Sequence, residues 1–309
     1  MSTTHDQRRH LLRLTALAAA SAALRPGLVL AAAEPLAVQT LGDDAWVLST
    51  PYGNVLALRN AAGLLLVDGL REDDTPALLA ALEQQTGSAA VNLLYNTHWH
   101  EDHTGSNETL RDGGARIVAH ENTRLWLTNP FYAHWEQRQY QPRPPQALPT
   151  ETFYEQHSET FGDETIDSGL LFQAHTDGDI YVLLRERNIL ATGDLVINGG
   201  FPVLDPATGG WLGALTTEQA RLLELADDDT RIMPGRGALM TRAELRTYHE
   251  QIVTLRERIY ACVREGKGPR EMLAEDVAAG YETWGDPTLF VMSAYPGLGR
   301  HYREVDGVV

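Results

Sequence analysis

The sequence is short of cysteine and of positive charge, and each shortage excludes a class of protein. Its 309 residues include one cysteine, Cys262, which cannot form an internal disulfide or a cysteine-based zinc cluster. The 25 lysines and arginines are outnumbered by 42 aspartates and glutamates, which gives a formal charge of −17. Because affinity for phosphate-rich partners needs a cationic surface, we expect no binding to nucleic acid or to anionic membranes.

The sequence also lacks an apolar run that is long enough to span a membrane, but its first 33 residues have the pattern of an export signal. The arginine pair Arg8-Arg9 precedes a short apolar run over 14–24, and the alanines at 31–33 offer a cleavage site. We therefore expect residues 1–33 to be a signal peptide of the twin-arginine type, with an ordinary secretory signal as the alternative. The mature protein is then periplasmic or secreted, with no membrane attachment after the signal is removed.

The remaining residues, 34–309, are typical of a single globular domain with a sizeable core. Hydrophobic residues make up 43% of the chain, so disorder is excluded. Short apolar runs bounded by turn residues predict strands first, and strands that alternate with helices follow. This order favours an α+β fold in which helices cover sheets. The predicted strands are 46–50, 55–59, 64–67, 91–95, 116–119, 170–172, 180–184, 189–190 and 231–233, and the predicted helices are 75–85, 105–110, 122–128, 216–225 and 242–265.

Two segments depart from this regular alternation. Residues 129–150 are rich in proline and aromatic residues, and we expect an insertion that forms either a surface loop or one wall of a substrate cleft. From about residue 241 the chain is predicted to continue as a helical C-terminal extension.

The residues that carry chemistry are concentrated in the segment 97–105, directly after a predicted buried strand. It holds three histidines and two carboxylates, which are ligands for zinc or iron. In an extended segment alternate side chains point the same way, so His98 and His100 are placed to bind one ion. Asp102 and His103 follow, where the chain turns into a helix, and are placed to face a second position.

Four motifs together resemble the signature of the metallo-β-lactamase superfamily over roughly residues 36 to 240. The motifs are His98-x-His100-x-Asp102-His103, Leu66-Val67-Asp68-Gly69, His175-Thr176-Asp177-Gly178-Asp179 and Thr192-Gly193-Asp194. The resemblance implies a four-layer αββα sandwich as a single domain, with the site at one edge of the two sheets. It also implies that Asp68 braces the metal loop.

The same resemblance implies the ligands of two metal sites. His98, His100 and His175 would hold the first metal, and Asp102 and His103 would belong to the second, with Asp194 bridging the two. The family's next ligand is a histidine in a Pro-Gly-His-Gly turn, where this chain has Pro234-Gly235-Arg236-Gly237. Arginine stays protonated and offers only donors, so it is not a normal metal ligand.

We therefore expect one tightly bound Zn²⁺ and a second site that Arg236 makes doubtful. The alternative arrangement has Arg236 turned out of the site while two ions bind. In the expected arrangement Arg236 is a fixed positive charge that pairs with Asp194 or Asp102, or orients an anionic substrate.

The expected activity is metal-dependent hydrolysis of an acyl bond in a small-molecule substrate: a β-lactam, a lactone or a related ester or thioester. Zinc with an open position lowers the pKa of its bound water to about 7 and so supplies hydroxide at neutral pH. Asp102 would orient that nucleophile and move its proton, while Arg236 polarises the substrate oxygen. Two alternatives remain: a mononuclear Fe²⁺ dioxygenase on the same fold, and a non-catalytic metal-binding protein of the cell envelope. The sequence does not define the oligomeric state.

Overall fold

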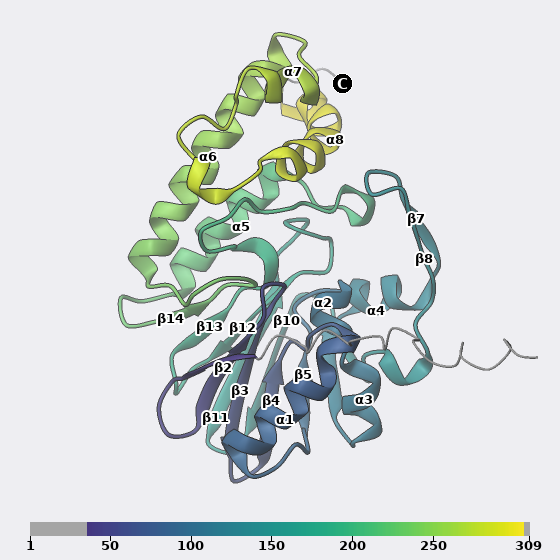
Figure 1. Cartoon of the computed structure of the whole chain (residues 1–309), viewed down its shortest axis with the longest axis vertical. Helices are drawn as coiled ribbons and strands as arrows, with labels where there is room; N and C mark the ends of the chain where they lie inside the picture. Colours follow the sequence, from purple (N-terminus) through teal and green to yellow (C-terminus); the bar gives the residue numbers. More distant parts are fainter. Residues whose placement is uncertain (1–35, 306–309) are drawn as a thin grey trace, which may run out of the picture. The chain divides into compact units, whose positions relative to one another are not determined.

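The computed structural model of the chain describes residues 36–305, with side chains described up to residue 298 (Figure 1). The predicted signal peptide lies outside these residues. The described residues fall into one compact unit. None of the helices within residues 36–305 has the length and apolar character that crossing a bilayer requires.

A seven-stranded sheet forms the first half of the described chain. Its strand order is β1-β2-β3-β4-β5-β6-β9; the first four strands pair antiparallel, and β4, β5, β6 and β9 pair parallel. The strands are β1 (Ala37–Thr40), β2 (Ala45–Ser49), β3 (Asn54–Asn60), β4 (Gly63–Val67), β5 (Leu93–Tyr95), β6 (Arg116–His120) and β9 (Glu151–Phe153).

A five-stranded sheet follows, in the order β10-β11-β12-β13-β14, with only the last pair parallel. Its strands are β10 (Gln156–Phe161), β11 (Glu164–Leu170), β12 (Ile180–Leu184), β13 (Ile189–Ala191) and β14 (Arg231–Met233). The helices are α1 (Thr75–Thr86), α2 (Glu101–Thr104), α3 (Asn107–Asp112), α4 (Glu121–Thr128), α5 (Leu212–Leu225), α6 (Arg242–Arg264), α7 (Pro269–Ala274) and α8 (Thr288–Val305).

Three apolar clusters show that the elements form four layers. Alternate side chains of a strand point to opposite faces of its sheet, so a strand that is apolar on both faces packs into two hydrophobic cores. In β4, Leu65 and Val67 pack between the two sheets, whereas Leu66 packs toward Leu78 and Leu82 of α1. A third cluster joins the outer face of the second sheet to α5, α6 and α8 (Figure 1). The α+β, four-layer αββα prediction is therefore confirmed.

The structure corrects two of the predicted elements and adds several, among them β10. Residues 129–150 are not an irregular loop, because β7 (Phe131–Ala133) and β8 (Arg138–Tyr140) form a hairpin in which the rings of Phe131 and Tyr140 stack 4.9 Å apart. The strand predicted at 170–172 was wrong, since β11 ends at Leu170 and Phe172 is exposed. Strand β10 was missed because it is largely polar and lies at the sheet edge.

The topology brings the predicted site together at one edge of both sheets. The loops that follow the parallel strands β4 and β5 emerge there, as do those after β13 and β14. The loop before β12 reaches the same edge, since β12 is antiparallel to β13 and the amide of Ile180 donates to the carbonyl of Thr97 at 2.9 Å.

Candidate metal centre

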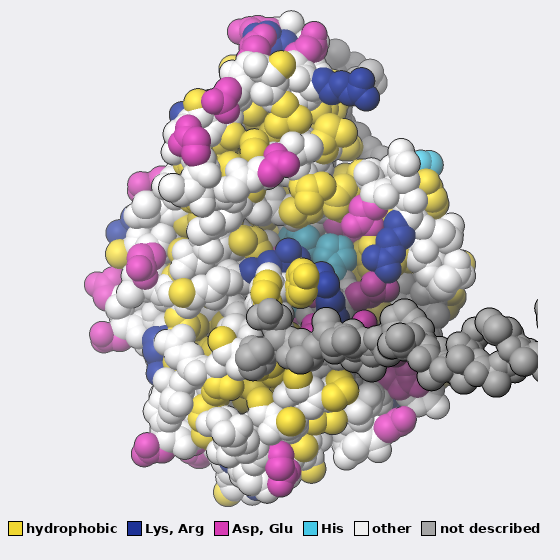
Figure 2. Space-filling model, in the orientation of Figure 1, with side chains coloured by type: hydrophobic (Ala, Val, Ile, Leu, Met, Phe, Trp, Pro, Cys, Tyr) yellow, Lys and Arg dark blue, Asp and Glu magenta, His cyan; other side chains and the backbone are white. Residues whose placement is uncertain are grey.

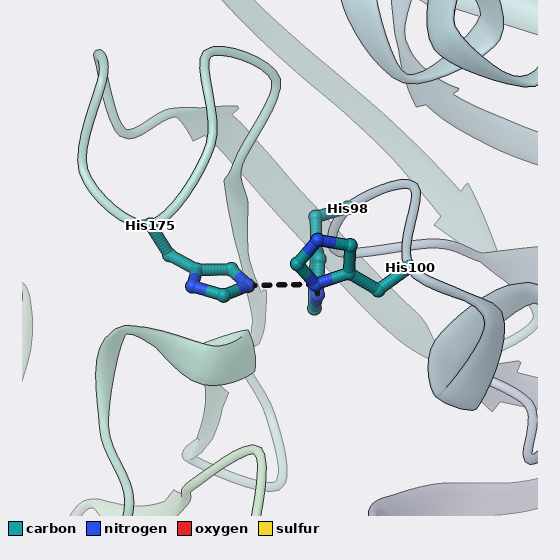
Figure 3. Close-up of side chains that lie close together, drawn as sticks. All are labelled: His98, His100 and His175. Atoms are coloured by element: carbon teal, nitrogen blue, oxygen red, sulfur yellow. Dashed lines mark hydrogen bonds between the residues drawn. The ribbon is translucent and has the colours of Figure 1, made fainter. Parts of the chain in front are cut away.

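Three histidine rings from two loops converge on one point (Figure 3). His98 and His100 follow β5, and His175 lies in the loop before β12. His100 Nδ1 lies 3.2 Å from His98 Nε2 and 2.9 Å from His175 Nε2. This arrangement offers one nitrogen from each ring to a single ion, and all three nitrogens lie within 4.8 Å of one another.

The nitrogen on the far side of each ring has its own partner, which fixes the ring's orientation. His98 Nδ1 lies 3.1 Å from the hydroxyl of Thr97, and His175 Nδ1 donates to the carbonyl of Val203. His100 Nε2 lies 3.4 Å from Asp205 Oδ2. Partners of this kind set the tautomer that leaves the inward nitrogen free to bind a metal.

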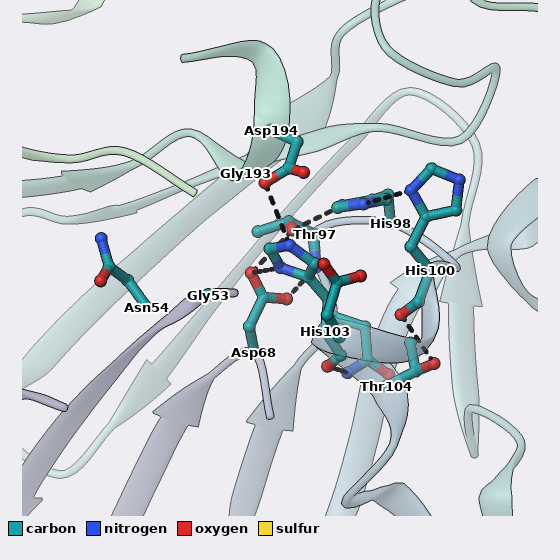
Figure 4. A network of polar contacts seen from close by, with 12 residues as sticks. Gly53, Asn54, Asp68, Thr97, His98, His100, His103, Thr104, Gly193 and Asp194 are labelled. Carbon is teal, nitrogen blue, oxygen red and sulfur yellow. Dashed lines mark hydrogen bonds and ion pairs between the residues drawn. The ribbon is translucent and has the colours of Figure 1, made fainter. Parts of the chain in front are cut away.

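A second group lies beside the first and centres on His103 (Figure 4). Its Nδ1 donates to Asp68 Oδ2 at 2.9 Å, and Asp68 also accepts from the amide and the hydroxyl of Thr97 at 2.7 and 2.8 Å. His103 Nε2 lies 3.1 Å from Asp194 Oδ1. Asp68 thus braces the metal loop as expected, and His98, His103 and Asp194 form a second cluster of possible ligands.

Arg236 is turned into the site and holds two carboxylates. Its Nη2 donates to Asp194 Oδ2 at 2.8 Å and to Asp102 Oδ2 at 2.9 Å. Asp102 joins neither ligand cluster among the described residues. The ligands predicted for a second metal are Asp102, His103 and Asp194. In this structure the guanidinium of Arg236 is bound to two of them, Asp102 and Asp194.

The position of Arg236 is fixed by the backbone of its turn. Asn54, at the start of β3, donates from its side-chain amide to the carbonyls of Pro234 and Gly237 at 2.9 and 2.8 Å. Gly235 packs so tightly against Asp194 that a Cβ on it would lie 2.1 Å from Asp194 Oδ1. The turn is therefore held directly against the aspartate with which Arg236 pairs.

The donor set fits a divalent metal. Burial and the neighbouring imidazoles lower the pKa of His98 well below its usual value, and burial lowers the pKa of His175 to about 4, so both rings are neutral at pH 7. His103 Nε2 and Asp194 Oδ1 are buried and make no hydrogen bond of acceptable geometry. Buried polar atoms rarely remain unsatisfied, and a ligand to a cation is one explanation for such atoms.

Opposing effects set the charge of the two carboxylates nearest the histidines. Burial acts to raise the pKa of Asp194, but Arg236 and His103 lower it well below its usual value. Burial acts likewise on Asp205, and its contacts with His100, Thr208 and Trp135 lower its pKa to about 2. Both carboxylates are therefore ionised at neutral pH and favour cations.

A cavity of about 810 Å³ opens onto two of the three histidines, His100 and His175, and also has Asp102 and Arg236 in its lining. Figure 2 shows histidine side chains at a hollow of the surface, with basic and acidic side chains beside them. Trp135, Arg138 and Tyr140 of the 129–150 insertion line the cavity as well. Of the two interpretations of this insertion, the structure favours a wall of the cleft.

Sequence reasoning missed Asp205, whereas Trp135 belongs to the aromatic insertion for which a cleft wall was one of the two interpretations. Asp205 is 1% exposed and accepts from the indole nitrogen of Trp135 at 3.0 Å, so it joins the hairpin to the His100 ring. No motif marks Asp205, which precedes a short 3-10 helix in a long loop. Asp179 braces the His175 loop, because its carboxylate accepts from the amides of His175 and Thr176 at 2.7 and 2.8 Å.

Comparisons with known proteins agree with this architecture. The sequence profile of the metallo-beta-lactamase superfamily matches residues 49–237. A metallo-beta-lactamase type 2 from Bacillus cereus is 26% identical over 219 residues, which cover 68% of this chain and 80% of that protein.

Solved structures are similar in fold at lower identity. A metallo-beta-lactamase from Pontibacter korlensis has a TM-score of 0.57 and 19% identity, and the match covers 70% of this chain and 98% of that one. A stereoselective inverting sec-alkylsulfatase from Pseudomonas sp. has a TM-score of 0.65 and 14% identity, over 84% of this chain and 50% of that one. Profile, relatives, four-layer fold and histidine cluster agree, and the chain belongs to the metallo-β-lactamase superfamily.

Proposed function

We propose that this chain is an exported metal-dependent hydrolase that cleaves an acyl bond, in a β-lactam, a lactone or a related ester or thioester, with one tightly bound zinc ion. The observation that carries the single-metal part is the double contact of Arg236 with Asp102 and Asp194. A second ion would have to displace a guanidinium that is hydrogen-bonded to both carboxylates. Two unit charges of one sign about 4 Å apart repel by about 4 kcal/mol at an effective dielectric constant near 20.

Zinc bound by His98, His100 and His175 would supply a water molecule whose pKa is near 7 and would polarise the substrate's carbonyl. The chain's own residues then divide the remaining work. Asp102 lines the cavity and has only its Oδ2 bound to Arg236, so its Oδ1 is the atom that accepts the proton of the attacking water and passes it to the leaving group. Arg236 lines the same cavity and fixes the orientation of the Asp102 carboxylate through its hydrogen bond to Oδ2.

The walls of the cavity favour a small molecule with an apolar part. Trp135, Val203 and Leu289 line it together with the polar groups already described. Trp135 is anchored by Asp205, so this wall is held in place next to the histidines. Such a wall excludes water from one side of a bound substrate and strengthens the electrostatic interactions inside.

The test is turnover by zinc-loaded protein against a panel of a β-lactam, a lactone, a thioester, a phosphodiester and a secondary alkyl sulfate. We expect hydrolysis of the β-lactam or the lactone, and a loss of at least about a hundredfold in kcat for Asp102→Asn at unchanged zinc content. Asp167→Asn is the matched control, because Asp167 pairs with Arg185 and does not line the cavity. This variant should keep full activity. Absence of hydrolysis across the acyl substrates would refute the proposal, and oxygen consumption by the iron-loaded protein would favour the dioxygenase instead.

A further inference from the structure

Three arginines line the cavity above the histidines, and two of them are already paired. Arg236 forms ion pairs with Asp102 and Asp194. Arg138 forms one with Glu101, in which Nη2 lies 2.7 Å from Oε2. Arg71 is different, because no carboxylate of the described chain lies within ion-pair distance of its guanidinium. Of the three arginines that line the cavity, Arg71 is therefore the one without a carboxylate partner among the described residues.

The guanidinium of Arg71 is nevertheless held in place. Its central carbon lies 3.4 Å from the centre of the Tyr52 ring, which is the geometry of a cation–π contact. A guanidinium stacked in this way keeps the donors at its edge free for a planar, bidentate partner.

The backbones that carry the two stacked side chains are both packed against α2, the helix that contains Asp102 and His103. A Cβ on Gly105 would lie 2.7 Å from the carbonyl carbon of Arg71, and a Cβ on Gly53 would lie 3.2 Å from the carbonyl oxygen of Asp102. The loop before Gly53 is tied down as well, since the Thr50 hydroxyl accepts from the amides of Tyr52 and Gly53, each at 3.1 Å. The stacked pair of Arg71 and Tyr52 is thus held in a fixed position relative to the edge of the sheets where the histidines lie.

We propose that Arg71, positioned by Tyr52, binds the carboxylate of an anionic substrate and so selects carboxylate-bearing molecules for this site. The inference rests on the proposed function and names the substrate class for it. The chain as a whole has a formal charge of −17 and repels anions at long range, so recognition of an anion needs a local cation. The apolar wall formed by Trp135 and Leu289 would then receive the rest of the molecule.

The experiment measures binding rather than turnover, with 4-phenylbutyrate and its neutral amide as probes of the zinc-loaded protein. The ratio of the two dissociation constants, amide over carboxylate, isolates the contribution of the negative charge. We expect Arg71→Gln to lower this ratio about tenfold, and Arg71→Lys to restore part of it. Attraction of the carboxylate to zinc is common to the wild type and the variants, so it cancels when their ratios are compared.

Two further variants test the geometry. Tyr52→Phe keeps the ring and should keep the ratio, whereas Tyr52→Ala removes the stack and should lower it. Arg143→Gln is the matched control: Arg143 pairs with Glu72, next to Arg71 in sequence, and does not line the cavity. A ratio that is the same in wild type and Arg71→Gln would overturn the inference, as would an equal fall in Arg143→Gln. Because no turnover is needed, a protein that hydrolyses none of the acyl substrates refutes the proposed function without deciding this result.

Discussion

Arg236 and Asp194 come from the loops after two neighbouring parallel strands, and Nη2 of one lies 2.8 Å from Oδ2 of the other. The same nitrogen reaches Asp102 at 2.9 Å. A single guanidinium group therefore binds both carboxylates. In the proposed one-metal arrangement this side chain balances their negative charges in place of a second ion.

The turn that carries Arg236 should not tolerate a side chain at Gly235. A methyl group there would lie 2.1 Å from Asp194 Oδ1, so either the turn or Asp194 must move. We expect Gly235→Ala to lower the free energy of unfolding by about 3 kcal/mol, as overpacking of a core does. Urea denaturation of the zinc-free protein measures this. Gly268→Ala, where a Cβ has 3.7 Å to its nearest neighbour, is the control and should cost less than about 1 kcal/mol. Equal stability of both variants would contradict the packing described.

Loss of the charge on Asp205 should weaken zinc binding although Asp205 does not belong to the three-histidine cluster. Its carboxylate lies against His100 Nε2 and thereby favours the tautomer that leaves Nδ1 free for the metal. We expect Asp205→Asn to lower zinc affinity about 10–100-fold, measured by competition with a chromophoric chelator. Asp167→Asn removes a carboxylate that pairs with Arg185 and does not line the cavity, so it should leave the affinity unchanged. Unchanged affinity in Asp205→Asn would show that the contact does not orient the ring.

Acid should destabilise the protein in part through His120, which belongs to neither cluster of possible metal ligands. Burial lowers the pKa of His120, whose Nδ1 accepts from the amide of Asn122 at the start of α4 while Nε2 lies 2.8 Å from the Tyr154 carbonyl. In the unfolded chain His120 takes up a proton near pH 6.5, and in the folded chain only at lower pH. Its contribution to stability is thus complete above about pH 6.5 and is lost as the pH falls below that value.

We therefore expect His120→Asn to show a weaker dependence of unfolding free energy on pH between 7.5 and 5 than the wild type. Asparagine keeps a capping oxygen but has no proton to gain. The other titrating groups cancel in the difference between the two proteins, which urea denaturation at each pH provides. Parallel pH profiles would mean that His120 keeps its ordinary pKa.

The sequence predicted the strands and helices that have strong apolar periodicity, and it predicted the place of the site because ligand motifs follow buried strands. His98 and His100 follow β5, whereas His175 precedes the antiparallel strand β12, and these strand directions bring all three histidines to one edge of the sheets. Asp205 was beyond reach, since one aspartate in a loop has no pattern that distinguishes it from a solvated one. The β7–β8 hairpin was missed for a related reason, because its proline-rich flanks resemble those of a loop.

The most direct test is the zinc content of the purified protein after exhaustive dialysis, compared with that of Arg236→His. Histidine in place of arginine removes the fixed charge and returns a neutral nitrogen ligand to the turn. The proposed single-metal site predicts about one equivalent of zinc per wild-type chain and about two per Arg236→His chain. Two equivalents retained by the wild type would contradict it, because they would show that Arg236 leaves the second position when metal is present.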